Sequence, residues 1–170
     1  MKPTPSPADT LRKVIKVAQI NGMVVVFPVA ILCTLAAAVL GDWKSTIFGL
    51  LIAASGWSEW HGAKLLKRGE ARGIGWLVRS QLYLLGLILL YSLWQMARYN
   101  PALVRSLITP DIARMYEDAG VDIQDVVRIA YHALYGTLAL STLFYQGGLA
   151  LFYRRRAVAV RAALGKISDK

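Results

Sequence analysis

Four long apolar blocks are the feature of this sequence that most limits how the chain can fold. The blocks run over about residues 21–40, 45–63, 74–96 and 127–153. As an α-helix, at about 1.5 Å per residue, each block is long enough to cross a hydrocarbon layer of roughly 30 Å. Hydrophobic residues make up 56% of the chain, more than in an ordinary soluble domain. The pattern predicts an all-α integral membrane protein with four transmembrane helices in an antiparallel bundle.

Two features of the first apolar block bear on whether it is cleaved and whether its helix is straight. Ala36 and Ala38 resemble the cleavage motif of a secretory signal peptide, but the segment ahead of the block is far longer than the charged leader of such a peptide. We therefore expect an uncleaved span. Pro28 lies inside the block, and it predicts a kink in the preceding turn because proline lacks a backbone donor and crowds that turn.

The distribution of charge predicts how the spans are oriented. The chain has a formal net charge of +10, and its Lys and Arg residues concentrate in segments 1–18, 64–73 and 154–170. Segment 97–126 instead has three Arg against five acidic residues. In a four-span arrangement the three basic segments fall on one side, which the positive-inside rule makes cytoplasmic. We expect a multi-pass protein of a plasma membrane, a bacterial inner membrane, with both termini in the cytoplasm and the lipid bilayer rather than nucleic acid as partner.

The spans form a membrane domain, residues 21–153, between two basic cytoplasmic pieces, residues 1–20 and 154–170. Within the first piece, PADTLRKVIKVAQI places apolar residues at helical spacing and basic residues on the remaining faces. One interpretation is a helix in the membrane interface with its basic side toward anionic headgroups. The other is a basic leader that continues into the first span.

The outer loop, residues 97–126, contains a pattern typical of a short amphipathic helix. In ITPDIARMYEDAG, Thr109 is placed to cap the start of the helix and Gly120 to end it. The apolar stripe of this helix consists of Ile112, Met115, Tyr116 and Ala119. We expect the stripe to pack on the outer mouth of the bundle or on the membrane surface, with a partner protein as the alternative.

An acidic residue inside the second span is the strongest functional signal. Glu59 precedes the basic turn by about as many residues as Arg79 follows it, so the two charges are expected at equal depth in an antiparallel hairpin. Small neighbours, among them Ser55, Gly56 and Gly75, would let the two helices approach closely. Because an isolated charge is costly inside a membrane, we predict an intramembrane ion pair between Glu59 and Arg79. The alternative is that Glu59 couples to a proton or a cation during transport.

The fourth span carries a polar stripe at alternating spacings of three and four residues. The stripe includes His132, Tyr135, Thr142 and Gln146, and the opposite face holds Leu140, Phe144 and Leu151. We expect the polar stripe to face the bundle, where Thr142 and Gln146 hydrogen-bond to neighbouring helices. A polar translocation path is the alternative.

The sequence contains no assembled catalytic or metal-binding motif such as HExxH, GxSxG or a P-loop. The single cysteine, Cys33, is expected to pack within its apolar block. His61 and His132 are expected near opposite membrane faces, so they cannot both ligate one haem iron. We therefore expect no enzyme activity, no cofactor and no metal.

These features predict a small membrane protein of non-enzymatic function. The first interpretation is an accessory or interaction subunit that contacts a membrane-protein partner or a second copy of itself. The alternative is a small oligomeric transporter or channel-like protein that uses Glu59 and the polar stripe of the fourth span.

Overall fold

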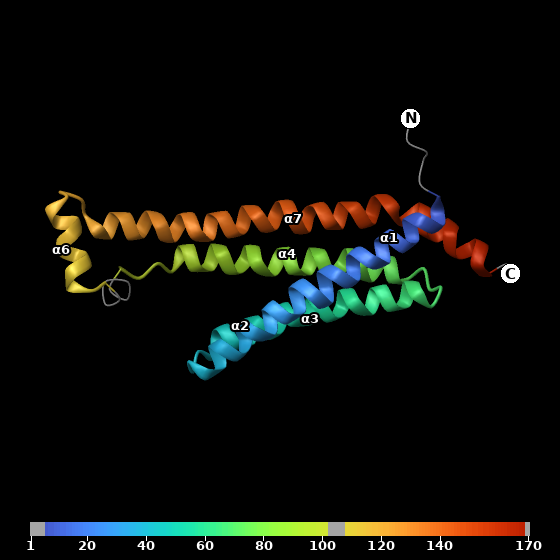
Figure 1. Cartoon of the computed structure of the whole chain (residues 1–170), viewed down its shortest axis with the longest axis horizontal. Coiled ribbons are helices and arrows are strands. Elements are labelled where there is room, and N and C mark those ends of the chain that lie inside the picture. The colour runs from blue at the N-terminus through green and yellow to red at the C-terminus, as the bar shows by residue number, and fades with distance from the viewer. Residues whose placement is uncertain (1–5, 102–107, 169–170) are drawn as a thin grey trace, which may run out of the picture. The chain divides into compact units, whose positions relative to one another are not determined.

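The computed structural model describes residues 6–101 and 108–168, and these residues are almost entirely helical, with no strand among them. The all-α prediction is therefore confirmed. The elements, shown in Figure 1, are α1 (Pro7–Gln19), the π-helix η1 (Ile20–Val26), α2 (Phe27–Val39), α3 (Trp43–Lys67), α4 (Gly73–Ala97), α6 (Pro110–Asp118) and α7 (Ile123–Ser168).

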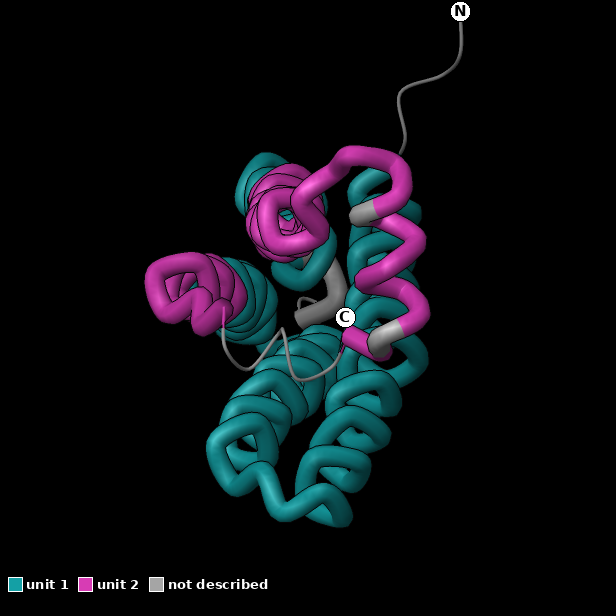
Figure 2. Tube along the Cα trace, turned by 90° about the vertical axis from the view of Figure 1, so that its left-hand side faces the viewer, with its two compact units in different colours: residues 1–86, 145–170 teal, residues 87–144 magenta. Residues whose placement is uncertain are grey.

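The chain divides into two compact units (Figure 2). Unit 1 consists of the described residues up to Gly86 together with those from Tyr145 onward. Unit 2 contains the segment between them, Leu87–Phe144. Helices α4 and α7 each contribute to both units, and the two units are described separately below.

Within residues 6–101 and 108–168, two helices are long and apolar enough to cross a membrane, judged by length and composition. One is the continuous helix Pro7–Val39, which includes α1, η1 and α2, and the other is α4. The predicted spans 45–63 and 127–153 lie within α3 and α7, so all four apolar blocks are helical. The crossing of a membrane by four helices stays a prediction.

Helix α1 opens unit 1 with a well-formed cap. Ser6 is the N-cap, its hydroxyl accepts a hydrogen bond from the amide of Asp9 at 3.1 Å, and Pro7 occupies the first turn, where its missing N–H costs nothing. The helix runs on into η1 and α2 without a break. This continuity follows the second interpretation of the N-terminal piece, a basic leader that enters the first apolar block.

The π-helix η1 lies immediately ahead of Pro28. The amide of Phe27 donates to the carbonyl of Gly22, five residues back, rather than to the fourth residue back. A proline ring crowds the carbonyl of the preceding turn and offers no N–H to it, and widening that turn relieves the clash. The sequence located the distortion correctly, the distortion is a π-helix, and the kink expected there stays a prediction.

Helices α3 and α4 form a hairpin through a short turn in which Gly69 has φ +85°. The helices approach closely near this turn, because a Cβ built on Gly73 would lie 2.5 Å from the carbonyl oxygen of Gly62. Gly75, which we expected to allow the close approach, has no such neighbour within 4 Å. The contact thus occurs two residues earlier on α4, on the other side of the helix.

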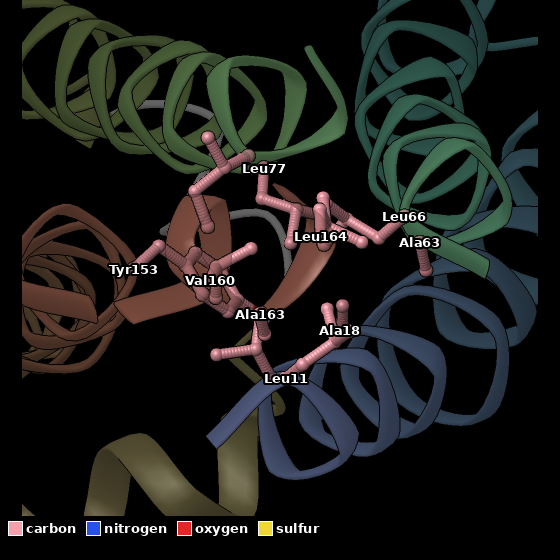
Figure 3. Packing of buried hydrophobic residues seen from close by; sticks show 11 residues of the cluster. Leu11, Ala18, Ala63, Leu66, Leu77, Tyr153, Val160, Ala163 and Leu164 are labelled. Carbon is pink, nitrogen blue, oxygen red and sulfur yellow. The ribbon is translucent and has the colours of Figure 1, made fainter. Parts of the chain in front are cut away.

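A hydrophobic cluster joins α1, α3, α4 and α7 within unit 1 (Figure 3). Its members include Leu11 and Ala18 from α1, Ala63 and Leu66 from α3, Leu77 from α4, and Tyr153, Val160, Ala163 and Leu164 from α7. The apolar face of α1 is therefore buried against protein, which argues against its insertion into the membrane interface. Residues 154–168, expected as a separate basic tail, continue α7 as a helix.

Unit 2 contains the second half of α4, α6 and the first part of α7. Its interior is aromatic: ring pairs with centroids 4.8 to 6.0 Å apart join Tyr91, Tyr99, Tyr131, His132 and Tyr135. Helix α6 has the predicted position, and Gly120 follows it with φ +71°. Its stripe is not packed on the described helices, because Met115 is 63% exposed and Ile112 is also exposed; packing on a membrane surface or a partner protein stays a prediction.

The turn between α2 and α3 is stabilised by Asp42, the N-cap of α3. The hydroxyl of Ser45 donates to Oδ2 of Asp42 at 2.5 Å, and the amide of Ser45 donates to Oδ1 at 3.2 Å. These hydrogen bonds, the one from the hydroxyl first, lower the pKa of the Asp42 carboxyl below its ordinary value.

The lowered pKa of Asp42 predicts a pH-dependent contribution to stability. In the unfolded chain the Asp42 carboxyl takes up a proton at about pH 3.9, and in the folded protein it does so only at lower pH. The stabilisation by the charged N-cap is therefore present above that pH and is lost as the pH falls through the folded pKa. We expect the difference in thermal midpoint between wild type and Asp42→Ala in detergent to be constant above about pH 5 and to shrink below about pH 4. The same difference at pH 3 as at pH 7 would contradict this. Asp42→Asn, an uncharged cap, serves as the control, because its difference from Asp42→Ala should not depend on pH.

Candidate functional site

A buried carboxylate is the centre of unit 1. Glu59 on α3 is 1% exposed. Its Oε1 accepts a hydrogen bond from the Tyr153 hydroxyl on α7 at 2.6 Å, and its Oε2 accepts one from the Asn21 amide on η1 at 2.6 Å. Both partners are themselves buried and both are neutral. Within the described part of the chain, the contacts of Glu59 thus supply hydrogen-bond donors but no compensating positive charge.

Asn21 is held in place from a second side. The Tyr145 hydroxyl on α7 donates to Oδ1 of Asn21 at 2.9 Å, which leaves the amide nitrogen of Asn21 directed at Glu59. Asn21 lies in the first turn of η1, so the wide π-helical turn positions the side chain that contacts the carboxylate. A π-helical turn at a functional site is a common arrangement.

Glycines bring η1 close enough to α3 for this contact. A Cβ on Gly56 would lie 2.9 Å from the carbonyl oxygen of Gly22 and 3.0 Å from the amide of Phe27. A Cβ on Gly22 would meet Gly56 at 2.9 Å and the Cβ of Glu59 at 3.2 Å. The backbones therefore touch where Glu59 projects, and only residues without a side chain fit there.

Gln81 on α4 is the least satisfied buried side chain of unit 1. It is 0% exposed, and neither its amide nitrogen nor its carbonyl oxygen has a hydrogen-bond partner among the described residues. Ser55, four residues before Glu59, and Ser80, next to Gln81, are also buried. The hydroxyl of Ser55 donates to the carbonyl oxygen of Ser80 at 3.1 Å and so joins α3 to α4.

The predicted ion pair between Glu59 and Arg79 is not formed. Arg79 is exposed, and the ion pairs between described residues are Arg72–Glu70 and Arg128–Asp125. The prediction matched the two residues by depth but ignored their direction around the helix. At 100° per residue, Arg79 points away from the face of α4 that carries the buried Leu77, Ser80 and Gln81. The polar residues on the buried face of α4 are therefore Ser80 and Gln81, and Ser80 is the one that accepts a hydrogen bond from α3.

The polar stripe of the fourth span is divided between the two units. Thr142 and Gln146 are buried, whereas Leu140 and Phe144 on the opposite face are exposed. The carbonyl oxygen of Gln146 has no partner among the described residues, so the expected interhelical hydrogen bond through that atom is absent there. His132 and Tyr135 lie in unit 2, at the aromatic interior, and His132 Nδ1 is 2.8 Å from the carbonyl oxygen of Arg128.

Two further expectations concern residues away from Glu59. His61 lies between two tryptophans, stacked on Trp57 with centroids 5.4 Å apart and edge-on to Trp76 at 5.3 Å. Cys33 is exposed, so it does not have the packing role that its apolar surroundings suggested. Among the described residues no group of three or more His, Cys, Asp or Glu side chains is arranged to hold a metal ion.

Four polar residues of unit 1 described above were not predicted as candidate site residues: Asn21, Gln81, Tyr145 and Tyr153. For Gln81 a signal existed, because it is a polar residue within one helical turn of the depth assigned to Glu59. For Asn21 none existed, since its position depends on the π-helical turn ahead of Pro28. For Tyr153 a signal also existed, because it lies seven residues after Gln146, on the same helical face as the polar stripe.

No protein-family model, no curated protein and no solved structure matches this chain. The function must therefore be argued from the site. The fold and the site define a helical protein in which a carboxylate, held by an amide and a phenol, is enclosed by helices from both ends of the chain.

Proposed function

We propose that the chain is an integral membrane protein of a bacterial inner membrane with four spans, over about residues 21–40, 45–63, 74–96 and 127–153, and with both termini cytoplasmic. Two observations support this proposal. Many large apolar side chains are exposed on the helices, among them Leu32, Val39, Leu90, Leu134 and Phe144, which is costly in water and favourable in lipid. The basic segments at 7–18, 64–73 and 154–168 also all contribute residues to the hydrophobic cluster of unit 1, which supports a common, cytoplasmic side for them.

Cysteine labelling of intact spheroplasts tests this topology. In a Cys33→Ala background, Ala119→Cys, just beyond α6, should react with a membrane-impermeant maleimide from outside. Ala71→Cys, in the turn between α3 and α4, should react only after permeabilisation. The reverse pattern, or reaction of both from outside, would contradict the proposed orientation.

The function that the geometry supports best is a small proton-conducting transporter or channel-like protein that uses Glu59 as its proton-binding group. The observation that carries the proposal is that the Glu59 carboxylate is buried and accepts a hydrogen bond from a neutral group at each oxygen, while no cation contacts it among the described residues. Ionisable residues inside membrane helices face a bundle interior and mark ion or proton paths. An arginine partner would have held Glu59 permanently ionised and favoured a structural role, and Arg79 is exposed instead.

Proton flux into proteoliposomes tests the proposal. Vesicles with a trapped pH-sensitive dye and an imposed potassium diffusion potential should acidify faster with wild-type protein than without protein. Glu59→Gln, which keeps the size of the side chain and removes its titrating group, should reduce this flux at least tenfold. Glu70→Gln is the matched control, because Glu70 lies in the turn and contacts Arg72. Equal flux with wild type and Glu59→Gln would overturn the proposal.

A second candidate is a non-enzymatic accessory subunit, and α6 is the observation that favours it. Met115 and Ile112 form an exposed apolar patch on this short helix, of the kind that partner proteins cover. A stoichiometric partner retained in mild detergent by wild type and by Met115→Leu, but lost from Met115→Lys, would support this function. Retention by all three variants would exclude α6 as the contact.

A further inference from the structure

We propose that the basic end of unit 1 binds an anionic phospholipid, whose phosphate contacts exposed Lys and Arg side chains and whose glycerol and upper acyl chains contact the tryptophans beside them. The inference rests on the membrane location proposed above, but not on proton conduction. It goes beyond that proposal because it names the class of lipid that the protein selects from the bilayer.

Exposed basic side chains lie around the hydrophobic cluster of unit 1. Because the cluster joins α1, α3 and α7, basic residues next to its members are brought together from distant parts of the sequence. Six exposed residues of this kind define the basic rim: Lys13, Lys64, Lys67, Arg68, Arg154 and Arg161. Five of them are direct chain neighbours of cluster residues, and Arg68 lies two residues after Leu66. The rim thus gathers positive charge from three helices.

The charge of the basic rim is not balanced within the part of the chain that the structure describes. No rim residue belongs to an ion pair there, and the ion pair in the adjoining turn joins Arg72 to Glu70. Asp9 in α1 accepts a hydrogen bond from the Ser6 hydroxyl at 2.6 Å. Each Lys or Arg close to an anionic lipid surface raises the affinity about fivefold, so the rim favours a ligand with a net negative charge.

An aromatic surface adjoins the basic rim on α3 and α4. Trp57 is 51% exposed and Trp76 is 39% exposed. The His61 ring fills the space between these two indoles, with ring centroids 5.4 Å from Trp57 and 5.3 Å from Trp76. The ammonium of Lys64 lies 3.7 Å from the centre of the Trp60 ring, so a rim cation is held directly against this surface. Tryptophan rings prefer the headgroup level of a bilayer.

The order of side chains along α3 matches the order of groups in a phospholipid. Leu50, Trp57 and Lys64 are exposed and are spaced seven residues apart, which places them on one face of the helix at intervals of about 10 Å. This face presents an apolar side chain, an indole and an ammonium in turn. A phospholipid presents hydrocarbon, an ester-linked glycerol and a phosphate in the same sequence.

A soluble polyanion and a zwitterionic lipid each match this face less well. A free phosphate or a nucleic acid pairs with the cations but has no counterpart for the exposed apolar surface that follows the tryptophans. Phosphatidylcholine supplies the hydrocarbon and the phosphate, but the basic rim repels its quaternary ammonium. A lipid with a net negative headgroup, such as phosphatidylglycerol, uses both the rim and the apolar face.

Native mass spectrometry of the full-length protein in a neutral detergent tests the proposal, because it resolves bound lipids and gives their affinities. The protein is titrated with phosphatidylglycerol and, separately, with phosphatidylcholine that has the same acyl chains. Phosphatidylglycerol should bind to wild type at least tenfold more tightly. Equal affinities of wild type for the two lipids would overturn the proposal without any variant.

A triple variant tests the basic rim. Lys64→Gln, Lys67→Gln and Arg68→Gln together should weaken the binding of phosphatidylglycerol at least tenfold, because three of the six rim cations are removed. Binding of phosphatidylcholine should stay as in wild type, and normal helix content by circular dichroism confirms that the variant is folded.

A matched triple variant removes the same number of positive charges from unit 2. Arg98→Gln, Arg114→Gln and Arg128→Gln change exposed residues outside unit 1, and this variant should bind phosphatidylglycerol as wild type does. Equal losses in the two triple variants would mean that the net charge of the protein, rather than the basic rim, attracts the lipid, and would overturn the site.

The aromatic surface distinguishes a lipid from a soluble anion. Trp57→Ala should weaken phosphatidylglycerol binding at least threefold, whereas Trp94→Ala, at a residue of unit 2 with 48% exposure, should not. Glycerol phosphate, which has the anion but no acyl chains, should not displace the lipid. Displacement by glycerol phosphate, or full binding by Trp57→Ala, would identify a soluble anion as the ligand and overturn the lipid site. Failure of lipid selection is distinct from failure of the proposed topology, which cysteine labelling in spheroplasts measures separately.

Discussion

Asn21→Leu is expected to lower the free energy of unfolding by about 2–3 kcal/mol, because it removes one hydrogen bond to a buried carboxylate and leaves the Tyr145 hydroxyl without its acceptor. Single interhelical hydrogen bonds in membranes contribute less, about 0.6 kcal/mol on average. The larger value is expected because the group left without a donor is a carboxylate at 1% exposure. The measurement is reversible unfolding in mixed detergent micelles, followed by circular dichroism.

The double variant Asn21→Leu with Glu59→Leu provides the control for this prediction. Replacing both partners of a buried polar contact with apolar groups is often nearly neutral, so the double variant should be more stable than Asn21→Leu alone. If the two destabilisations simply add, the Asn21 amide does not stabilise Glu59, and the assignment of Asn21 as its partner is wrong.

Gly56→Ala is expected to destabilise the protein by about 1–3 kcal/mol, the usual cost of overpacking. The added Cβ meets the carbonyl oxygen of Gly22 at 2.9 Å and the amide of Phe27 at 3.0 Å, and both are backbone atoms that cannot rotate away. Helix α3 must separate from η1, which also moves Asn21 away from Glu59. We therefore expect Gly56→Ala to reduce proton flux as well as stability.

Gly86→Ala is the matched control for this substitution. Gly86 is also within a helix, and a Cβ there has no neighbour within 4 Å. Alanine has the higher helix propensity, so this variant should be unchanged or more stable by up to about 1 kcal/mol. Equal losses of stability in the two variants would mean that helix flexibility, rather than the close approach of η1 and α3, is what Gly56 provides.

The sequence alone was sufficient to predict the helices, but it was not sufficient to predict which side chains contact Glu59. The period and length of the apolar blocks predicted helices over all four, since these depend on local composition alone. The ion pair with Arg79 failed because residue number gives depth along a helix but not the direction of a side chain when the contact face is unknown. The contact face of α4 became clear only from the burial of Leu77 and Gln81.

The position of Asn21 lies beyond local prediction for a different reason. It depends on a π-helical turn that Pro28 favours but does not dictate, and on a backbone contact between Gly22 and Gly56, which are far apart in sequence. Tyr153 likewise reaches Glu59 only because α7 returns to pack on α1 and α3. Such long-range packing has no short-range pattern that could be read in advance.

The packing of α1 on the last helix also fixes the order in which the protein can be completed during synthesis. Leu11 and Ala18 emerge from the ribosome well before Val160, Ala163 and Leu164, with which they form one cluster. Contacts between distant parts of a chain close late. Until α7 has been synthesised, the apolar face of α1 lacks its partner side chains, and Glu59 lacks the hydrogen bond from Tyr153. The carboxylate therefore cannot be fully enclosed before α7 packs, and a chain cut short before Tyr153 leaves it without one of its two hydrogen-bond donors.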